Sequence, residues 1–126
     1  MNFLIFISLF SILVGCGQGE SRFLRKQVDR NGIKLSWYYY SHISNNSPDF
    51  VEVEKDDKKE IIYEATRVIT NVSLDDKTII IRVVEPSKNL VFIKNVSKNI
   101  FGYKIVIDSL ASYDELKFIP DGVKEK

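Results

Sequence analysis

The sequence predicts a mostly β fold, a small antiparallel β-sandwich or barrel of about 6–8 short strands. Three observations support this prediction. Apolar and polar residues alternate with a period of two over much of the chain after Gly32, and clusters of turn-forming residues interrupt this alternation about every 8–12 residues. No amphipathic segment long enough for a helix separates the predicted strands, which disfavours a parallel α/β fold.

Residues 33–42 form the clearest predicted strand, because apolar side chains occupy every second position. Successive side chains of a strand point to opposite faces, so the two sets of residues should separate. We expect one set to pack into the core and the other to meet solvent or a ligand. The predicted core set is Ile33, Leu35, Trp37 and Tyr39, and the opposite set is Lys34, Ser36, Tyr38, Tyr40 and His42.

Further extended segments follow, each bounded by turn-forming residues. They are predicted at residues 50–55, 60–65, 66–74, 78–84, 90–95 and 102–108, with one helical turn within residues 110–116. Residues 78–84 are almost all apolar and β-branched, as expected of a strand in the middle of a sheet. The core should therefore centre on this segment, and the end of the chain should form an edge.

The first twenty residues resemble an export signal in their arrangement. Residues 3–14 are apolar except for Ser8 and Ser11, and Gly15 and Cys16 follow directly. An apolar run of roughly 7–15 residues before a small residue is typical of a secretory signal, whereas a membrane-spanning helix needs roughly 20. The run is therefore too short to cross a membrane.

Leu13-Val14-Gly15-Cys16 resembles the lipobox of bacterial lipoproteins, and every position of the box is filled. The resemblance implies that a diacylglyceryl group is attached to Cys16 and that the chain is cut just before it. Cys16 is the only cysteine, so no intramolecular disulfide can form, and a modified thiol suits an exported chain. One departure from the pattern is that no Lys or Arg precedes the apolar run.

These features divide the chain into a cleaved signal peptide at residues 1–15, a lipidated Cys16 with a flexible tether over residues 16–21, and one β-rich domain at residues 22–126. A doubly acylated protein is stably anchored, so we expect a location in the bacterial envelope, at the inner or the outer membrane. In composition the domain resembles small lipoproteins of Bacteroidetes-like bacteria. In some of these bacteria, short sequences similar to Asp108-Ser109-Leu110 are glycosylated.

The charge of the chain limits its partners. Eighteen Lys and Arg residues against 17 Asp and Glu leave it nearly neutral, which argues against a nucleic-acid surface. An envelope protein or a glycan is the expected partner. Basic residues do gather after the tether, where two interpretations stay open: contact with lipid headgroups, or an ordinary solvated start of the domain. They are Arg22, Arg25, Lys26 and Arg30.

Sequence motifs for catalysis or cofactor binding are absent. The chain has no glycine-rich phosphate loop, paired-cysteine zinc site or nucleophile elbow, so we expect no cofactor, metal or catalytic residue. The aspartate pairs at 56–57 and 75–76 suit turns better than calcium sites. The alternative is a small envelope hydrolase that uses His42, the only histidine, with Ser41 or Ser47 and Asp49 as partners.

The run Trp37-Tyr38-Tyr39-Tyr40 carries the strongest indication of binding. Tyr38, Tyr40 and His42 fall on the face opposite the predicted core, and tyrosines are enriched at binding surfaces because they combine apolar area with a hydroxyl. The alternative is that a second sheet or a loop covers them. The sequence therefore predicts a non-catalytic binding or interaction module, with Tyr38, Tyr40 and His42 as the candidate binding surface.

Overall fold

The structure is a computed structural model, and it describes residues 21–41, 48–84, 93–95 and 98–125. The predicted signal peptide, Cys16, the tether up to residue 20, and His42 lie outside these described residues. The predicted strand at 90–95 lies partly outside them.

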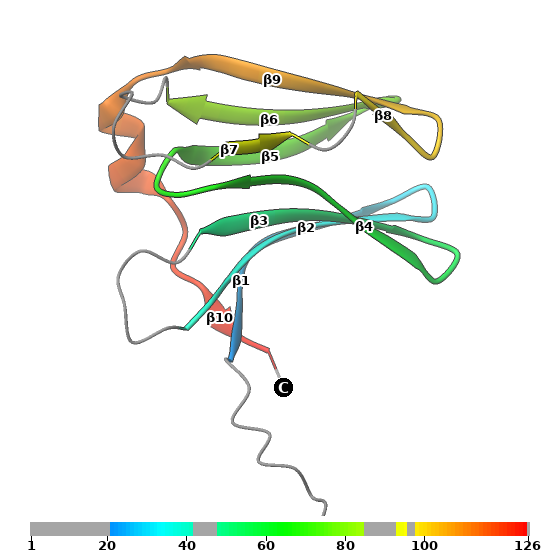
Figure 1. Cartoon of the computed structure of the whole chain (residues 1–126), viewed down its shortest axis with the longest axis horizontal. Helices are drawn as coiled ribbons and strands as arrows, with labels where there is room; N and C mark the ends of the chain where they lie inside the picture. The colour runs from blue at the N-terminus through cyan, green and yellow to red at the C-terminus, as the bar shows by residue number, and fades with distance from the viewer. Residues whose placement is uncertain (1–20, 42–47, 85–92, 96–97, 126) are drawn as a thin grey trace, which may run out of the picture.

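Two β-sheets pack face to face as a sandwich (Figure 1). The larger sheet has the strand order β10-β1-β2-β3-β4-β7, and the smaller one has the order β5-β6-β9-β8. The predicted fold class, a small and mostly antiparallel β-sandwich, is confirmed. The strands are β1 (Arg22–Arg30), β2 (Ile33–Tyr40), β3 (Asp49–Lys55), β4 (Lys58–Ala65), β5 (Ile69–Asp75), β6 (Thr78–Val84), β7 (Ile93–Asn95), β8 (Asn99–Ile100), β9 (Tyr103–Ala111) and β10 (Val123–Lys124), and a 3-10 helix, η1, covers Tyr113–Phe118.

Tight turns close the hairpins of the larger sheet. Asn31 and Gly32 join β1 to β2 with φ angles of 53° and 77°, and Asp56 and Asp57 join β3 to β4 with φ angles of 51° and 64°. Two successive positive φ angles are the signature of the type I′ turn, whose twist matches that of the flanking strands. Asn, Asp and Gly tolerate this conformation better than other residues, which explains why the chain turns at these positions.

The sequence predicts no strand at the position of β1. The only feature expected at residues 22–30 is a cluster of basic side chains at the start of the domain. Its alternation is broken at Arg25, where the register with β2 shifts between Leu24 and Lys26. Such a bulge moves the following side chains to the other face, so the period of two is lost in the sequence. A second difference is that β6 and β9 pair in parallel, because the chain passes through β7 and β8 before it returns.

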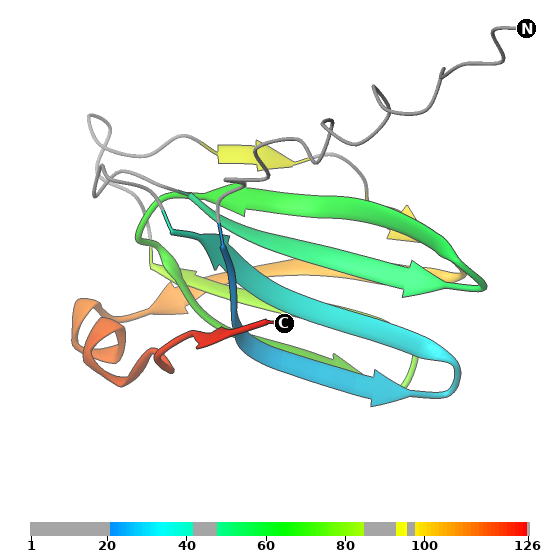
Figure 2. The same ribbon diagram turned by 90° about the horizontal axis from the view of Figure 1, so that it is seen from below.

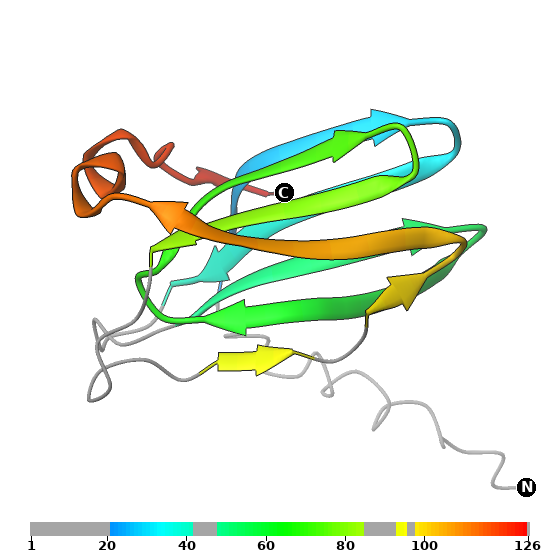
Figure 3. The same ribbon diagram turned by 90° about the horizontal axis from the view of Figure 1, so that it is seen from above.

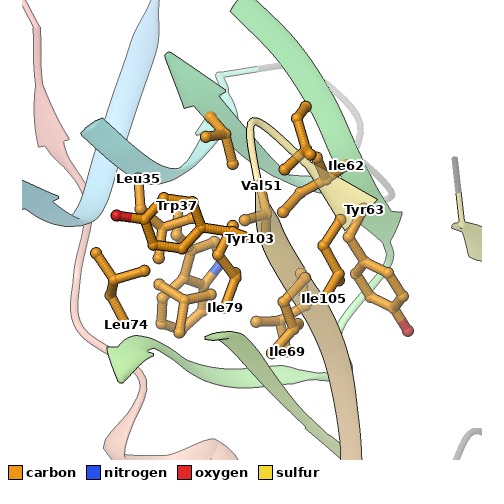
Figure 4. Packing of buried hydrophobic residues seen from close by; sticks show 14 of the residues in the cluster. Leu35, Trp37, Val51, Ile62, Tyr63, Ile69, Leu74, Ile79, Tyr103 and Ile105 are labelled. Atoms are coloured by element: carbon orange, nitrogen blue, oxygen red, sulfur yellow. The ribbon is translucent and has the colours of Figure 1, made fainter. Parts of the chain in front are cut away.

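The core lies between the two sheets (Figure 4). Leu35, Trp37 and Val51 of the larger sheet are fully buried and face Ile69 and Ile79 of the smaller one. The predicted core positions Ile33, Leu35 and Trp37 are confirmed, whereas Tyr39 is only half-buried. β6 lies between β5 and β9, as predicted for the most apolar segment.

The two ends of the sandwich differ (Figures 2 and 3). The hairpin end carries the tight turns after β1, β3 and β5. At the opposite end, which we call the proximal end, β1 begins, β2 ends and β9 leads into η1. Backbone hydrogen bonds from Ser41 N to Ser21 O (2.8 Å) and from Glu125 N to Arg22 O (2.9 Å) join three segments there. The first described residue and the C-terminal strand β10 therefore lie side by side.

Candidate functional site

A group of aromatic and charged side chains lies on the outer face of the larger sheet, near the proximal end. Three neighbouring strands bring it together, because Leu24 of β1 is opposite Tyr38 of β2, and Tyr38 is opposite Phe50 of β3. Val51 and Val53 point into the core, so the alternating residues of β3 point outwards. We call this group the outer-face aromatic cluster; its members are Arg22, Tyr38, Tyr40, Phe50 and Glu52.

Three rings of the cluster contact one another in the geometries that aromatic pairs prefer. The rings of Tyr38 and Phe50 are stacked, with centroids 5.5 Å apart and an angle of 21° between their planes. Tyr40 meets both rings edge-on, with centroid distances of 5.6 Å to Tyr38 and 5.7 Å to Phe50. The rings are thus held in one arrangement by mutual contact.

The guanidinium group of Arg22 covers the Tyr38 ring at 3.7 Å from its centroid, which is a cation–π contact. The same group forms ion pairs with Glu52 at 3.6 Å and with Glu125 at 2.7 Å. Burial raises the pKa of the Tyr38 hydroxyl, and the nearby Glu52 and Tyr40 raise it further. Tyr38 therefore stays protonated and acts as a packing residue with a weak hydroxyl contact, 3.5 Å from Glu52 Oε1.

The expectation that Tyr38 faces solvent is wrong, because only 1% of this residue is exposed. Arg22 and Phe50, which come from the two neighbouring strands of the same sheet, cover its ring. Tyr40 and Phe50 are half-buried and keep part of their rings accessible. The third predicted member, His42, lies outside the described residues, so the surface that the structure brings together is formed by Tyr40 and Phe50.

Phe50 is the residue that the sequence analysis missed. The signal for it was present in the alternation of residues 50–54, since Val51 and Val53 occupy the core positions and leave Phe50 on the outer face. Its position opposite Tyr38 depends on the register between β2 and β3, which is set by pairing of Tyr39 with Asp49 across the larger sheet. The sequence does not show that register, because residues 42–47 separate the two strands.

A second group of side chains lies at the edge of the core, also near the proximal end. Trp37 Nε1 and Arg25 Nε each donate a 2.8 Å hydrogen bond to Oδ2 of Asp49, which is 8% exposed. Burial raises the pKa of the Asp49 carboxyl, while Arg25 and Trp37 lower it in part. Asp49 is one of the partners considered for a catalytic His42. In the structure its carboxylate accepts the hydrogen bonds of Trp37 and Arg25.

The outer face of the smaller sheet carries an ion-pair network around Arg82. Its guanidinium group donates to Asp108 Oδ2 at 2.7 Å and to Glu115 Oε1 at 2.8 Å. Leu110 N and Ser112 N donate to the same two carboxylates, at 3.0 Å and 2.7 Å. Asp108 and Glu115 both have lowered pKa values as a result, and the network fastens η1 to the end of β9.

The basic residues that follow Ser21 are bound within the domain. Arg22 and Arg25 pair with carboxylates, Lys26 Nζ donates to Asn71 Oδ1 at 2.9 Å, and Arg30 Nη1 donates to the Leu74 carbonyl at 3.2 Å. The last two contacts link the edge of β1 to β5. Lys26 and Arg30 therefore join the two sheets along one edge of the sandwich.

A shallow hollow of about 310 Å³ opens at the hairpin end, between the turns after β1 and β3. Its walls include Arg30, Lys34, Glu54 and Asp57, so charges of both signs line it. Over the described part of the chain, no three side chains of the His, Cys, Asp or Glu type are placed to share a metal ion. The same described residues contain no helix with the length and apolar character to cross a membrane.

No protein-family model matches the chain, and comparisons with curated proteins and with solved structures likewise give no match.

Proposed function

We propose that the chain is a lipid-anchored lipoprotein of the bacterial envelope whose β-sandwich is a non-catalytic binding module. Its contact surface is the accessible part of Tyr40 and Phe50 in the outer-face aromatic cluster, and its partner is an envelope protein or glycan. The observation that carries this proposal is the fixed, half-exposed pair of rings on a sheet face, both of which contact the buried ring of Tyr38.

Rigid aromatic side chains are effective contact residues. Tyrosine and phenylalanine offer a large contact area while losing little conformational entropy, and a surface already held in its bound geometry avoids part of the cost of binding. Tyr40 and Phe50 meet both conditions, because each contacts Tyr38 and the other ring. The half-buried Leu24 pairs with Tyr38 on the same face and adds apolar area beside the cluster.

The position of the cluster agrees with a role close to a membrane. Tyr40 is the last residue of β2, and the next residue, Ser41, donates to the carbonyl of Ser21. Four residues lie between Cys16 and Ser21, so the chain from one to the other takes five steps and spans at most about 18 Å when fully extended. An acylated Cys16 would therefore keep the cluster near the lipid surface, where a partner in the envelope is within reach.

The lipid anchor is tested by comparing the wild-type chain with Cys16→Ser. We expect the wild type to partition into the detergent phase and to carry the mass of its acyl chains. Cys16→Ser should lose both properties, because no other thiol is present to accept a lipid. Equal partitioning of the two chains would contradict the anchor.

The binding surface is tested by cross-linking in intact cells, followed by capture and mass spectrometry of Tyr40→Ser and Phe50→Ser. The matched control is Ile80→Ser, which changes a half-buried apolar residue on the outer face of the smaller sheet. Loss of one partner from both cluster variants, with the control unaffected, supports the surface. Equal capture by all three variants contradicts it; if no protein is captured, purified envelope polysaccharide is the next probe.

A further inference from the structure

The C-terminal segment exposes most of the large apolar side chains that meet solvent. Among the described residues, five such side chains are exposed, and four of them fall between residues 110 and 123. Leu110 is 84% exposed, Phe118 81%, Val123 72% and Tyr113 63%. This concentration is notable in a segment of fourteen positions, because scattered single apolar residues are the usual pattern on a protein surface.

The segment lies at the proximal end, beside the start of the described chain. Val123 and Lys124 of β10 pair with Leu24 and Phe23 of β1, and Glu125 N donates to the carbonyl of Arg22. η1 lies at the same end of the sandwich, remote from the hairpins (Figures 2 and 3). Val123 therefore lies beside the strand from which the chain leads back to Cys16, and the other exposed apolar residues lie at the same end of the sandwich.

The backbone of the segment is held firmly against the domain. Arg25 Nη1 donates to the carbonyl of Pro120 at 2.9 Å, and Ile119 packs against the core. Gly122 is pressed against Phe23 and Tyr39 so closely that an added Cβ atom would lie 2.7 Å from Phe23 Cβ. The exposed side chains thus project from a fixed support instead of folding back to bury themselves.

We propose that this segment, residues 110–124, docks on the lipid bilayer to which Cys16 is anchored, with Leu110, Phe118 and Val123 entering the interface. The proposal rests on the lipid anchor of the proposed function. Two observations select a bilayer as the occupant: the exposed residues are Leu, Phe, Tyr and Val, types that enter the boundary between headgroups and acyl chains, and the tether limits the segment to the vicinity of that boundary.

Apolar contact, and not charge, drives this docking. The exposed charged residues of the segment include both Lys117 and Lys124 and both Asp114 and Asp121, and Lys117 pairs with Asp114 at 3.6 Å. The local charge is therefore balanced, so anionic lipid is not required. Docking should occur on vesicles of pure phosphatidylcholine and should persist at high salt, where surface electrostatics are screened.

Docking also sets the direction in which the domain faces. With the proximal end on the lipid, the hairpin end points away, since Lys58 and Ala65 at the two ends of β4 are about 23 Å apart along an extended strand. The outer-face aromatic cluster then lies close to the bilayer, and the charged hollow between the hairpins lies farther out. A partner that is held close to the membrane would therefore meet the outer-face aromatic cluster.

The test uses the full lipidated chain in phosphatidylcholine vesicles that contain lipids with a nitroxide quencher on the acyl chain. Lys117→Cys and Lys58→Cys each introduce one exposed thiol for an environment-sensitive fluorophore, at the proximal and the hairpin end respectively. Cys16 is the only native cysteine, so the wild type shows directly whether it is free to react. We expect about twofold or greater quenching and a blue shift for the label at position 117, and neither change at position 58.

A second pair of variants tests the apolar residues themselves in the Lys117→Cys background. Combining Leu110→Ser, Phe118→Ser and Val123→Ser should abolish the quenching, whereas Ile61→Ser, which changes the exposed apolar residue outside the segment, should leave it intact. Circular dichroism of both variants checks that the fold is unchanged. Quenching that survives the triple change would overturn the role of these side chains.

The other outcomes separate docking from anchoring. If the protein stays on the vesicles and takes up one label but position 117 is not quenched, the docking proposal fails while the lipid anchor stands. If wild-type Cys16 reacts with the label or the chain is not retained, the anchor fails and docking fails with it. Energy transfer between labels on different copies without lipid quenching would assign the surface to a second copy of the chain, which also overturns docking.

Discussion

The indole N–H of Trp37 and the carboxylate of Asp49 form a buried hydrogen bond of 2.8 Å across neighbouring strands of the larger sheet. Arg25 Nε reaches the same carboxylate oxygen, also at 2.8 Å, and its guanidinium group lies 4.2 Å from the centroid of the Tyr39 ring. Because Arg25 also donates to Pro120 O, this one carboxylate links three strands and the C-terminal segment.

Replacing Asp49 by alanine should lower the free energy of unfolding by about 2–4 kcal/mol, because Trp37 N–H and the guanidinium group of Arg25 lose their buried acceptor. Urea denaturation followed by fluorescence measures this, since Trp37 is the only tryptophan. Asp29→Ala removes an exposed carboxylate of β1 and serves as the control, with an expected change within about 0.5 kcal/mol. Equal stability of the two variants would show that the buried pair does not contribute.

Tyr38 should behave as a packing residue. Tyr38→Ala leaves a cavity beneath Arg22 and beside Phe50, and should cost about 2–4 kcal/mol of unfolding free energy. Tyr38→Phe keeps the ring and loses only the hydroxyl contacts with Glu52 and Tyr40, so its cost should stay below about 1 kcal/mol. The comparison is made by chemical denaturation, and a similar, small loss for both variants would place Tyr38 among the dispensable surface residues.

The network around Arg82 has a defined pH dependence. The pKa values of Asp108 and Glu115 are lowered in the folded chain, so their contribution to folding is present above the unfolded pKa values. That contribution is lost as the pH falls through the lowered folded values. Protonation of either carboxyl would also weaken the attachment of η1 to β9.

Arg82→Gln should raise the pKa of Glu115 more than that of Asp108. Arg82 is the largest cause of the shift at Glu115, whereas the hydrogen bond from Leu110 N is the largest cause at Asp108 and remains in the variant. Carboxyl-detected NMR titration measures both values. Lys117→Gln, which removes only the exposed pair with Asp114, is the control and should shift neither group. Equal changes in the pKa values of Glu115 and Asp108 would contradict the unequal contribution of Arg82 to the two groups.

Gly122→Ala should detach the C-terminal segment. The added Cβ atom would collide with the Tyr39 ring and with Phe23, and overpacking of this kind costs about 1–3 kcal/mol. Hydrogen exchange of the Glu125 amide, which donates to Arg22 O, should accelerate strongly. Asp121→Ala changes the preceding exposed residue and should leave that exchange rate unaltered. Slow exchange in both variants would show that the segment tolerates the extra atom.

Much of the sandwich follows from local patterns. The alternation around Trp37 predicts which side chains of β2 enter the core, and the β-branched run predicts that β6 lies inside its sheet. The aspartates at 56 and 57 predict the turn between β3 and β4. These features depend on residues close to one another in the chain, so the sequence displays them directly.

Other features depend on contacts between distant residues. β1 is half-buried and interrupted by a bulge at Arg25, so its period is not visible, and only its pairing with β2 and β10 identifies it as a strand. The parallel pairing of β6 with β9 is likewise not encoded by either segment alone. The burial of Tyr38 arises because Arg22 and Phe50, one from each neighbouring strand, close over its ring.

Local sequence patterns are enough to predict the fold class, the turns at Asp56-Asp57 and Asp75-Asp76, most of the core of β2 and a lipid anchor at Cys16. Each of these depends on a periodicity or a motif of adjacent residues. Two properties become visible only in the folded chain: which aromatic residues stay accessible, and where the C-terminal apolar residues lie relative to the start of the chain. Those properties depend on strand register and on contacts between residues such as Arg25 and Pro120, which are far apart in the sequence and adjacent only after folding.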